Sequence, residues 1–163
     1  MPETHEIERK FWKALRSDMT VMLGVAGAND VTPRPMTAQI DSDADHGPIW
    51  FFTSKTSSLA ESVTSEQPSY FNFVDKGHDV WASVSGRMSI STDRAVIDRL
   101  WNAFIAAWYE GGKDDPNLCL MRFDPKDAEI WLDGSSLLAG LKVLFGSDPK
   151  SDYADNVAKV SLG

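Results

Sequence analysis

The sequence predicts a mainly β domain of antiparallel strands flanked by a few helices. Several short segments alternate apolar and polar residues and are separated by turn-forming residues. One long alternating segment, residues 80–91, carries a glycine near its middle, where a bend or bulge is expected. Residues 4–18 and 93–108 instead repeat apolar side chains at helical spacing, so we expect two substantial helices beside the sheet.

The first 40 residues predict a helix followed by two strands. Ile7, Phe11 and Leu15 recur at helical spacing among charged residues, which is typical of an amphipathic helix that covers one end of a sheet. Strands are expected at Met19–Ala26 and Arg34–Ile40, because each is apolar or alternating and turn-forming residues lie between them.

The segment 49–61, IWFFTSKTSSLAE, predicts a buried strand that leads into a helix. Ile49–Phe52 is continuously apolar, and hydroxyl side chains follow at once: Thr53, Ser54, Thr56, Ser57 and Ser58. Ser58 and Glu61 have the spacing of a capping box, so we expect the helix to begin there. Hydroxyls and free N–H groups at a helix start can bind a phosphate ester, although an ordinary serine-rich turn is the alternative interpretation.

Arg34 is the natural cationic partner for such a site. It lies between Pro33 and Pro35 at the start of a predicted strand, where prolines are tolerated and fix the backbone. Its guanidinium can therefore offer a planar pair of donors to a phosphate from a fixed position.

The middle of the chain predicts two more strands and a long helix. Ser69–Val74 and Val80–Ser91 alternate in strand fashion, and Gly86 marks the expected bulge. Asp93–Trp108 carries two neighbouring apolar rows, broader than one buried face requires. This helix either packs entirely on its own sheet or places aromatic side chains at a dimer interface, and we favour the interface.

The last third of the chain predicts two strands, a helix and a mobile end. Leu118–Phe123 and Ala128–Leu132 read as strands joined by a turn at residues 124–127, and Ser135–Phe145 has helical spacing. Residues 146–163 are expected to be a mobile tail. Cys119 is interpreted as a small buried apolar residue, because no catalytic histidine accompanies it.

Composition restricts the partners that we expect. The 163 residues predict one domain, residues 1–163, and the net charge of −8 argues against nucleic-acid binding. No apolar run is long enough to span a membrane and no secretory segment is recognisable, so a cytoplasmic location is expected. The acidic loop Asp41–Pro48 includes His46, but we interpret it as a solvated turn and expect no metal site.

Four segments in this order resemble the FMN-binding split barrel of the pyridoxamine 5′-phosphate oxidase family, and in particular its general stress protein 26 branch. They are PRPMTAQ (residues 33–39), IWFFTSKTSSLAE (49–61), LWNAFIAAWYEGGKDDP (100–116) and DAEIWL (127–132). The resemblance extends to about residue 145. It implies a β-barrel of six to seven antiparallel strands and a homodimer whose flavin sites are shared between subunits.

The resemblance also implies which residues bind the cofactor. Arg34, Ser57 and Ser58, assisted by Thr53 and Ser54, would hold the flavin phosphate. Pro35, Met36, Thr37 and Phe52 would lie at the flavin, with Met36 and Thr37 offering backbone groups to its ring. Trp101, Trp108 and Trp131 are candidates to reach the flavin from the partner chain.

Departures from the oxidase pattern change the expected function. Gln39 replaces a lysine, Ser58-Leu59 replaces Arg-Lys, Trp81 replaces a glutamine at the flavin, and the C-terminal Arg-x-His is absent. We therefore expect a stress-related protein that binds FMN, with FAD as a second cofactor, and that lacks pyridoxamine phosphate oxidase activity. The alternative is a flavin-dependent oxidoreductase or reductase that acts on a small molecule, and haem or deazaflavin binding is a weaker third hypothesis. No catalytic residue is identified.

Overall fold

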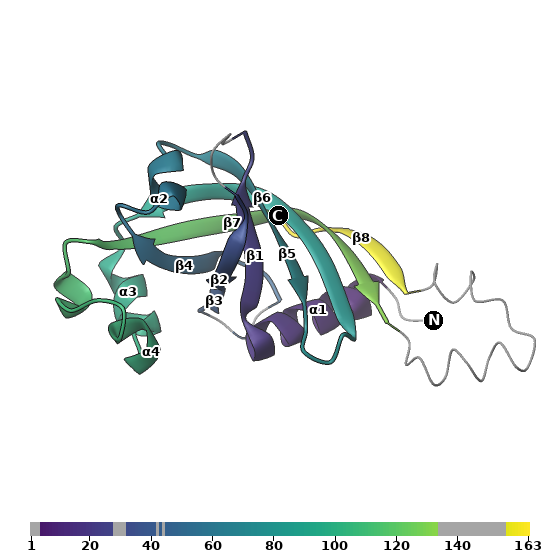
Figure 1. Cartoon of the computed structure of the whole chain (residues 1–163). Helices are drawn as coiled ribbons and strands as arrows, with labels where there is room; N and C mark the ends of the chain where they lie inside the picture. The colour runs from purple at the N-terminus through teal and green to yellow at the C-terminus, as the bar shows by residue number, and fades with distance from the viewer. Residues whose placement is uncertain (1–3, 28–31, 42, 44, 134–155) are drawn as a thin grey trace, which may run out of the picture.

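A computed structural model describes residues 4–27, 32–41, 43, 45–133 and 156–163 of the protein, and in them eight strands form one curled antiparallel sheet (Figure 1). The strand order is β2-β1-β5-β6-β7-β4-β3, and β8 pairs with β7. The strands are β1 (Thr20–Val25), β2 (Arg34–Thr37), β3 (Gln39–Ile40), β4 (Ile49–Ser54), β5 (Gln67–Val74), β6 (Val80–Ser91), β7 (Leu118–Leu132) and β8 (Val157–Ser161). Helix α1 (Thr4–Asp18) packs against β6, β7 and β8, as its apolar spacing predicted.

The sheet curls into a barrel because one stretch of chain supplies both of its ends. β2 pairs with β1 and β3 pairs with β4, yet the two strands are separated only by Ala38. Ala38 is fully buried, and its N–H donates to the carbonyl of Met19 at 2.7 Å. The predicted strand Arg34–Ile40 is therefore broken at this residue. The mainly β split-barrel class is confirmed.

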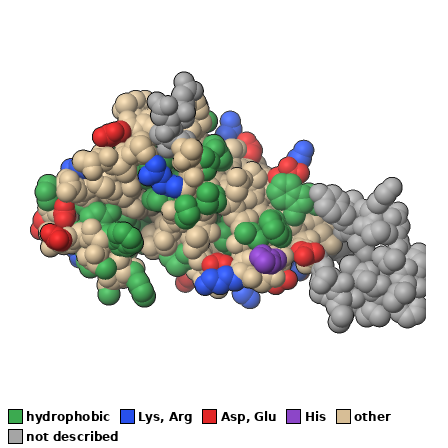
Figure 2. All heavy atoms as spheres, viewed as in Figure 1, with side chains coloured by type: hydrophobic (Ala, Val, Ile, Leu, Met, Phe, Trp, Pro, Cys, Tyr) green, Lys and Arg blue, Asp and Glu red, His purple; other side chains and the backbone are tan. Residues whose placement is uncertain are grey.

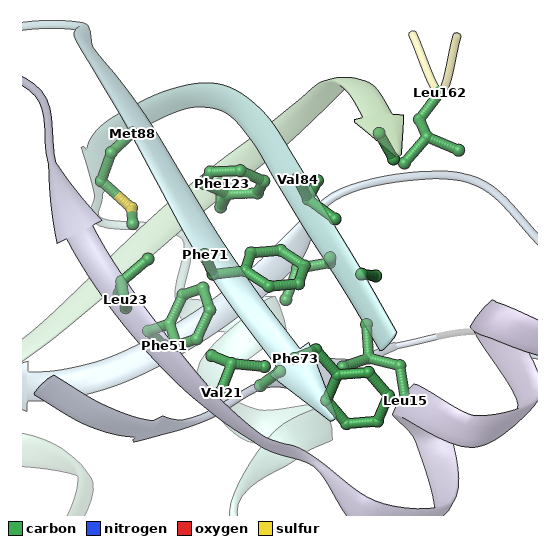
Figure 3. Packing of buried hydrophobic residues seen from close by; sticks show 14 of the residues in the cluster. Leu15, Val21, Leu23, Phe51, Phe71, Phe73, Val84, Met88, Phe123 and Leu162 are labelled. Atoms are coloured by element: carbon green, nitrogen blue, oxygen red, sulfur yellow. The ribbon is translucent and has the colours of Figure 1, made fainter. Parts of the chain in front are cut away.

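The barrel core is built from the side chains that point inward from the strands (Figure 3). Phe71 of β5 lies at its centre against Phe123 of β7, with ring centroids 5.3 Å apart. Phe11 of α1 packs its ring on Phe73 at 6.3 Å, which closes the helix end of the barrel. Burying such rings removes large apolar areas from water, so this core is the main source of stability.

Gly86 marks a β-bulge, as expected. The register between β6 and β7 shifts between Ser85 and Gly86, where Ser85 lies opposite Asp127 and Gly86 opposite Pro125. A Cβ atom at Gly86 would collide with the carbonyl oxygen of Asp124 and would lie 2.8 Å from the ring of Phe123. The ladder with β6 continues through this bulge, so the two strands predicted at 118–123 and 128–132 are in fact one strand, β7.

The long helix predicted from Asp93 to Trp108 is wrong, because the structure divides it into two short helices. Helix α3 (Arg94–Leu100) ends where Trp101 adopts an extended backbone (φ −61°, ψ 131°), and α4 (Ala103–Ala106) follows. Asn102 caps α4, since its Oδ1 accepts from the Ile105 N–H at 3.0 Å. Asparagine favours this N-cap position over a helix interior, which explains the break.

The C-terminal residues correct a further expectation. Val157–Ser161 form β8 on the edge of β7, with Ala158 and Val160 buried, so a mobile tail is wrong for this part. The helix predicted at Ser135–Phe145 and the tail residues 146–155 lie outside the described residues. Among the helices that the structure describes, none combines the length and the apolar character needed to cross a bilayer.

Candidate functional site

A cavity of about 450 Å³ opens at the seam of the barrel, where β2 and β4 diverge. β4 pairs with β3 at Ile49 and Trp50, so among the described strands none follows the outer side of Phe52–Ser54. The short helix α4 and the residues just after it form the remaining wall. The lining residues are Thr20, Pro35, Met36, Thr37, Gln39, Phe52, Thr53, Ser54, Phe104, Ile105, Trp108 and Tyr109. None of them carries a formal charge.

Backbone groups at the seam are available to a ligand. The Lys55 N–H donates across to the carbonyl of Asn117 at 2.8 Å, on the β7 side of β4. Backbone direction alternates along a strand, so the N–H and C=O of Phe52 point away from β7, toward the open edge. β2 is the end strand on the other side of the seam and pairs with β1 alone among the described strands.

A cationic and hydroxyl-rich corner adjoins this cavity. Arg34 at the start of β2 donates from Nη2 to Ser58 Oγ at 2.5 Å, joining β2 to the start of α2 (Ser58–Ser62). Ser54 and Thr56 also place their hydroxyls within 2.9 Å of each other in the turn between β4 and α2. The corner thus gathers one guanidinium and several exposed hydroxyl donors.

Ser57, and not Ser58, is the N-cap of α2. Its backbone is extended (φ −68°, ψ 145°), and its Oγ accepts from the Ala60 N–H at 3.1 Å and from Thr53 Oγ1 at 3.1 Å. The capping box predicted for Ser58 and Glu61 is therefore wrong by one residue. Because Ser58 does not cap the helix, its side chain is exposed and its hydroxyl contacts Arg34.

The α4 side of the cavity presents one buried and one exposed aromatic face. Tyr109 is only 8% exposed and belongs to a second core cluster outside the barrel, together with Trp50, Val96, Ile97, Ile105, Leu118 and Leu120. Phe104 and Trp108 are 86% and 84% exposed. Apolar side chains gather over the position of α4 at the lower left of the molecule (Figure 2). Trp101 lies behind this wall, with its ring 6.3 Å from Phe52 and 6.1 Å from Tyr109.

Tyr109 connects this wall to the sheet. Its hydroxyl donates to the main-chain carbonyl of Thr53 at 2.9 Å. Burial, with smaller contributions from Cys119 and Asp115, raises the pKa of Tyr109 from 10.0 to about 12. The following loop is held by Asp115, whose carboxylate accepts from the N–H groups of Gly111 and Asn117, and these bonds lower the pKa of Asp115.

The structure brings most of the predicted cofactor residues together. Pro35, Met36, Thr37, Phe52, Thr53, Ser54 and Trp108 line the cavity, and Arg34, Ser57 and Ser58 lie at the adjoining corner. Trp101 packs behind the wall. Trp131 lies elsewhere, opposite Trp81 in the ladder between β6 and β7, and the two line a separate hollow.

Sequence reasoning missed Tyr109 and Phe104 as cavity residues. It named Gln39 only as a replacement for a lysine, although Gln39 lines the cavity and is buried. The available signal for Tyr109 was its position four residues after Ile105, on the same side of a helical turn. That spacing indicates burial, but it cannot reveal that the phenol reaches β4.

The acidic loop after β3 takes part in ion pairs. Asp41 receives two donors from Arg99 of α3, at 2.6 and 2.9 Å, and Asp45 lies 3.0 Å from Arg16 of α1. Within the described ranges, no group of three or more His, Cys, Asp or Glu side chains is arranged to hold a metal ion. The loop therefore connects neighbouring elements electrostatically.

The fold is that of a split-barrel protein, and at the barrel seam it has a cavity within the usual size range of small-molecule pockets. The family model described as "Pyridoxamine 5'-phosphate oxidase like" matches residues 6–150, and the chain belongs to this family. The crystal structure of the general stress FMN/FAD binding protein from the phytopathogen Xanthomonas citri is 56% identical, with a TM-score of 0.76. That match covers 88% of this chain and 100% of the other.

Two curated relatives match over shorter stretches. General stress protein 26 of Bacillus subtilis is 28% identical over 65 residues, 40% of this chain and 46% of the relative. Protein bli-3 of Neurospora crassa is 30% identical over 82 residues, 45% of this chain and 39% of the relative. The matches thus span less than half of the length of these curated relatives.

Proposed function

We propose that this protein binds FMN in the seam cavity and also accepts FAD, as a stress-related flavin-binding protein without pyridoxamine phosphate oxidase activity. One observation carries the proposal: the contact between Arg34 and Ser58 lies beside a cavity whose described lining residues are uncharged and partly aromatic. FMN has the matching division of chemistry, with an anionic phosphate attached to a planar neutral ring. The Xanthomonas citri relative, which is described as FMN/FAD binding, supports this assignment.

The cavity suits the ring of a flavin in size and in polarity. Its volume of about 450 Å³ lies within the usual range for small-molecule pockets. Phe52 and Trp108 offer ring faces, while the open edge of β4 offers the N–H and C=O of Phe52. Such an edge can donate to and accept from the alternating polar atoms of a heterocycle.

The corner suits a phosphate because its donors are fixed before binding. Pro35 restrains the backbone beside Arg34, and the guanidinium already reaches the start of α2. Charge-assisted hydrogen bonds of this kind are stronger than neutral ones. A single arginine among hydroxyls also suits a diphosphate, which spreads its charge over two groups, and this supports acceptance of FAD.

The same lining favours binding over catalysis by the protein itself. Among the described cavity residues there is no carboxylate, histidine, lysine or thiol to move a proton. The Tyr109 hydroxyl is occupied by Thr53, and its high pKa keeps it protonated. A bound flavin would supply redox chemistry, whereas these residues would hold and orient it.

We further propose a homodimer in which the α3–α4 region meets the partner chain near the cavity. Phe104 and Trp108 support this, because two large aromatic side chains on one short segment are more than 80% exposed. Exposed aromatic clusters of this kind are typical of protein interfaces. The same contact would place aromatic side chains beside a flavin bound at the seam.

The test is a titration of apoprotein with FMN, FAD and riboflavin. Arg34→Ala should weaken FMN binding by about 1.5 to 3 kcal/mol and leave riboflavin nearly unchanged, because riboflavin has no phosphate. Arg87→Ala is the matched control, since Arg87 is an exposed arginine of β6 that contacts Glu66 and not the cavity. Equal losses of affinity for FMN and riboflavin would show that the phosphate does not bind at this corner. Absence of flavin binding would refute the proposal. Bleaching of bound flavin by a nicotinamide nucleotide would favour the oxidoreductase alternative.

A further inference from the structure

We propose that Tyr109 is a positioning residue that fixes the α4 wall of the cavity to β4 and thereby sets the affinity for the ring portion of the ligand. The ligand part of this inference rests on the proposed flavin function, whereas the structural part does not. Tyr109 is assigned no contact with the flavin phosphate and no chemical step.

The contact that carries the inference joins two distant parts of the chain. Tyr109 and Thr53 are 56 residues apart, and the phenol reaches a main-chain oxygen at 2.9 Å. The acceptor is therefore the strand itself, whose position is fixed by the ladder between β4 and β7. Thr53 also lines the cavity, so the bond connects two walls of the same cavity.

The other contacts described for the wall are the Asn102 cap, the packing of Ile105 and the bond from the Gly111 N–H to Asp115. α4 is only four residues long, far too short to hold its position by helix formation alone. In this wall, Ile105 of α4 and Tyr109 after it are buried, at 6% and 8% exposure, whereas Phe104 and Trp108 are mostly exposed and add little anchorage. Ile105 packs without a preferred direction, so the Tyr109 hydroxyl supplies the directional contact to β4.

The ring of Tyr109 is itself held in place. Its ring centroid lies 6.1 Å from that of Trp101, and the Trp101 ring lies 6.3 Å from the ring of Phe52 in β4. The raised pKa means that the hydroxyl remains a donor throughout the neutral and mildly basic range. Removing only the hydroxyl should therefore loosen the wall and leave the packing of the ring intact.

The first experiment needs no flavin. Hydrogen exchange of the apoprotein should show that Tyr109→Phe speeds exchange of the amides of residues 105–109 by about fivefold, the equivalent of one ordinary hydrogen bond. Several of these amides donate within this turn, including those of Ala106, Ala107 and Trp108. Unchanged protection in strands β5 and β6 would show that the variant is folded. Unchanged exchange at 105–109 would overturn the inference.

The second experiment compares ligands. Tyr109→Phe should weaken the binding of FMN and of riboflavin by the same factor, about three- to tenfold, because the wall touches the ring that both ligands share. The loss of affinity should come mainly from faster dissociation. Tyr70→Phe is the control, since the Tyr70 ring lies against Gly24, away from the cavity. A loss of affinity for FMN alone, or for neither ligand, would overturn the inference that Tyr109 sets the affinity for the flavin ring. If the unchanged protein binds no flavin, the proposed function fails, and the exchange experiment still decides whether Tyr109 holds the wall.

Discussion

Replacing Ser57 with alanine should lower the stability of the protein, whereas replacing the adjacent Ser58 should weaken FMN binding and leave stability almost unchanged. Ser57 caps α2 by accepting from the Ala60 N–H, and it also accepts from the hydroxyl of Thr53. Loss of an N-cap serine costs about 1 kcal/mol, within a range of 0.5 to 2. The hydroxyl of Thr53 also loses its acceptor, so we expect Ser57→Ala to lower the free energy of unfolding by about 1 to 1.5 kcal/mol.

Ser58→Ala should leave stability almost unchanged. Ser58 is exposed, its hydroxyl contacts Arg34 at the surface, and alanine is the better helix former at the first helical position. We expect a change of less than about 0.5 kcal/mol in either direction. FMN binding should nevertheless weaken by about 0.5 to 1.5 kcal/mol through loss of one hydrogen bond, whereas riboflavin binding should not.

Urea unfolding of both variants and flavin titration of Ser58→Ala measure these effects. The unfolding slope should be the same for the two variants and the unchanged protein, which would show that the midpoints report stability. If Ser58→Ala destabilised the protein as much as Ser57→Ala, the helix would begin one residue later than described. The assignment of Ser58 to the phosphate corner would then fail as well.

Three further outcomes are expected. Gly86→Ala should destabilise the protein by about 1 to 3 kcal/mol in urea, because its Cβ would meet the carbonyl of Asp124, while Ser85→Ala should change little. The phenol of Tyr109 releases its proton near pH 10.0 in the unfolded chain and only near pH 12 in the folded chain. Between pH 10 and 12, the free energy of unfolding of the unchanged protein should therefore fall by about 1 to 2 kcal/mol more than that of Tyr109→Phe. A parallel decline of both proteins would contradict the buried phenol. Apoprotein should sediment as a dimer at low concentration, and the double variant Phe104→Ser, Trp108→Ser should shift it toward monomer. A monomeric parent protein would contradict the proposed interface.

Features encoded in local spacing were predictable from the sequence. The period of two in residues 69–74 and 80–91 predicted strands, because each strand here faces the core on one side only. Gly86 predicted the bulge, since a strand tolerates glycine best where another backbone approaches closely. Arg34 between prolines and the hydroxyl run after Phe52 were also recognisable locally, and the structure brings the two segments into contact through Arg34 and Ser58.

Other features depend on contacts between segments that are distant in the sequence. The break at Ala38 follows from the competition of β1 and β4 for the same stretch of chain, and the continuity of β7 follows from its long ladder with β6. Val157–Ser161 becomes a strand because β7 offers it an edge. No local period carries this information.

The residues of the candidate site show most clearly which features local sequence predicts and which depend on tertiary contacts. The sequence by itself determined that residues 53–58 would present hydroxyls near a helix start and that Arg34 would be held at the start of a strand. Only the tertiary structure decided that Ser57 caps the helix, that Ser58 meets Arg34, and that Tyr109 reaches the carbonyl of Thr53. The physical reason is that a hydrogen bond depends on atomic positions to within a few tenths of an ångström, and those positions are set by how the barrel packs and closes.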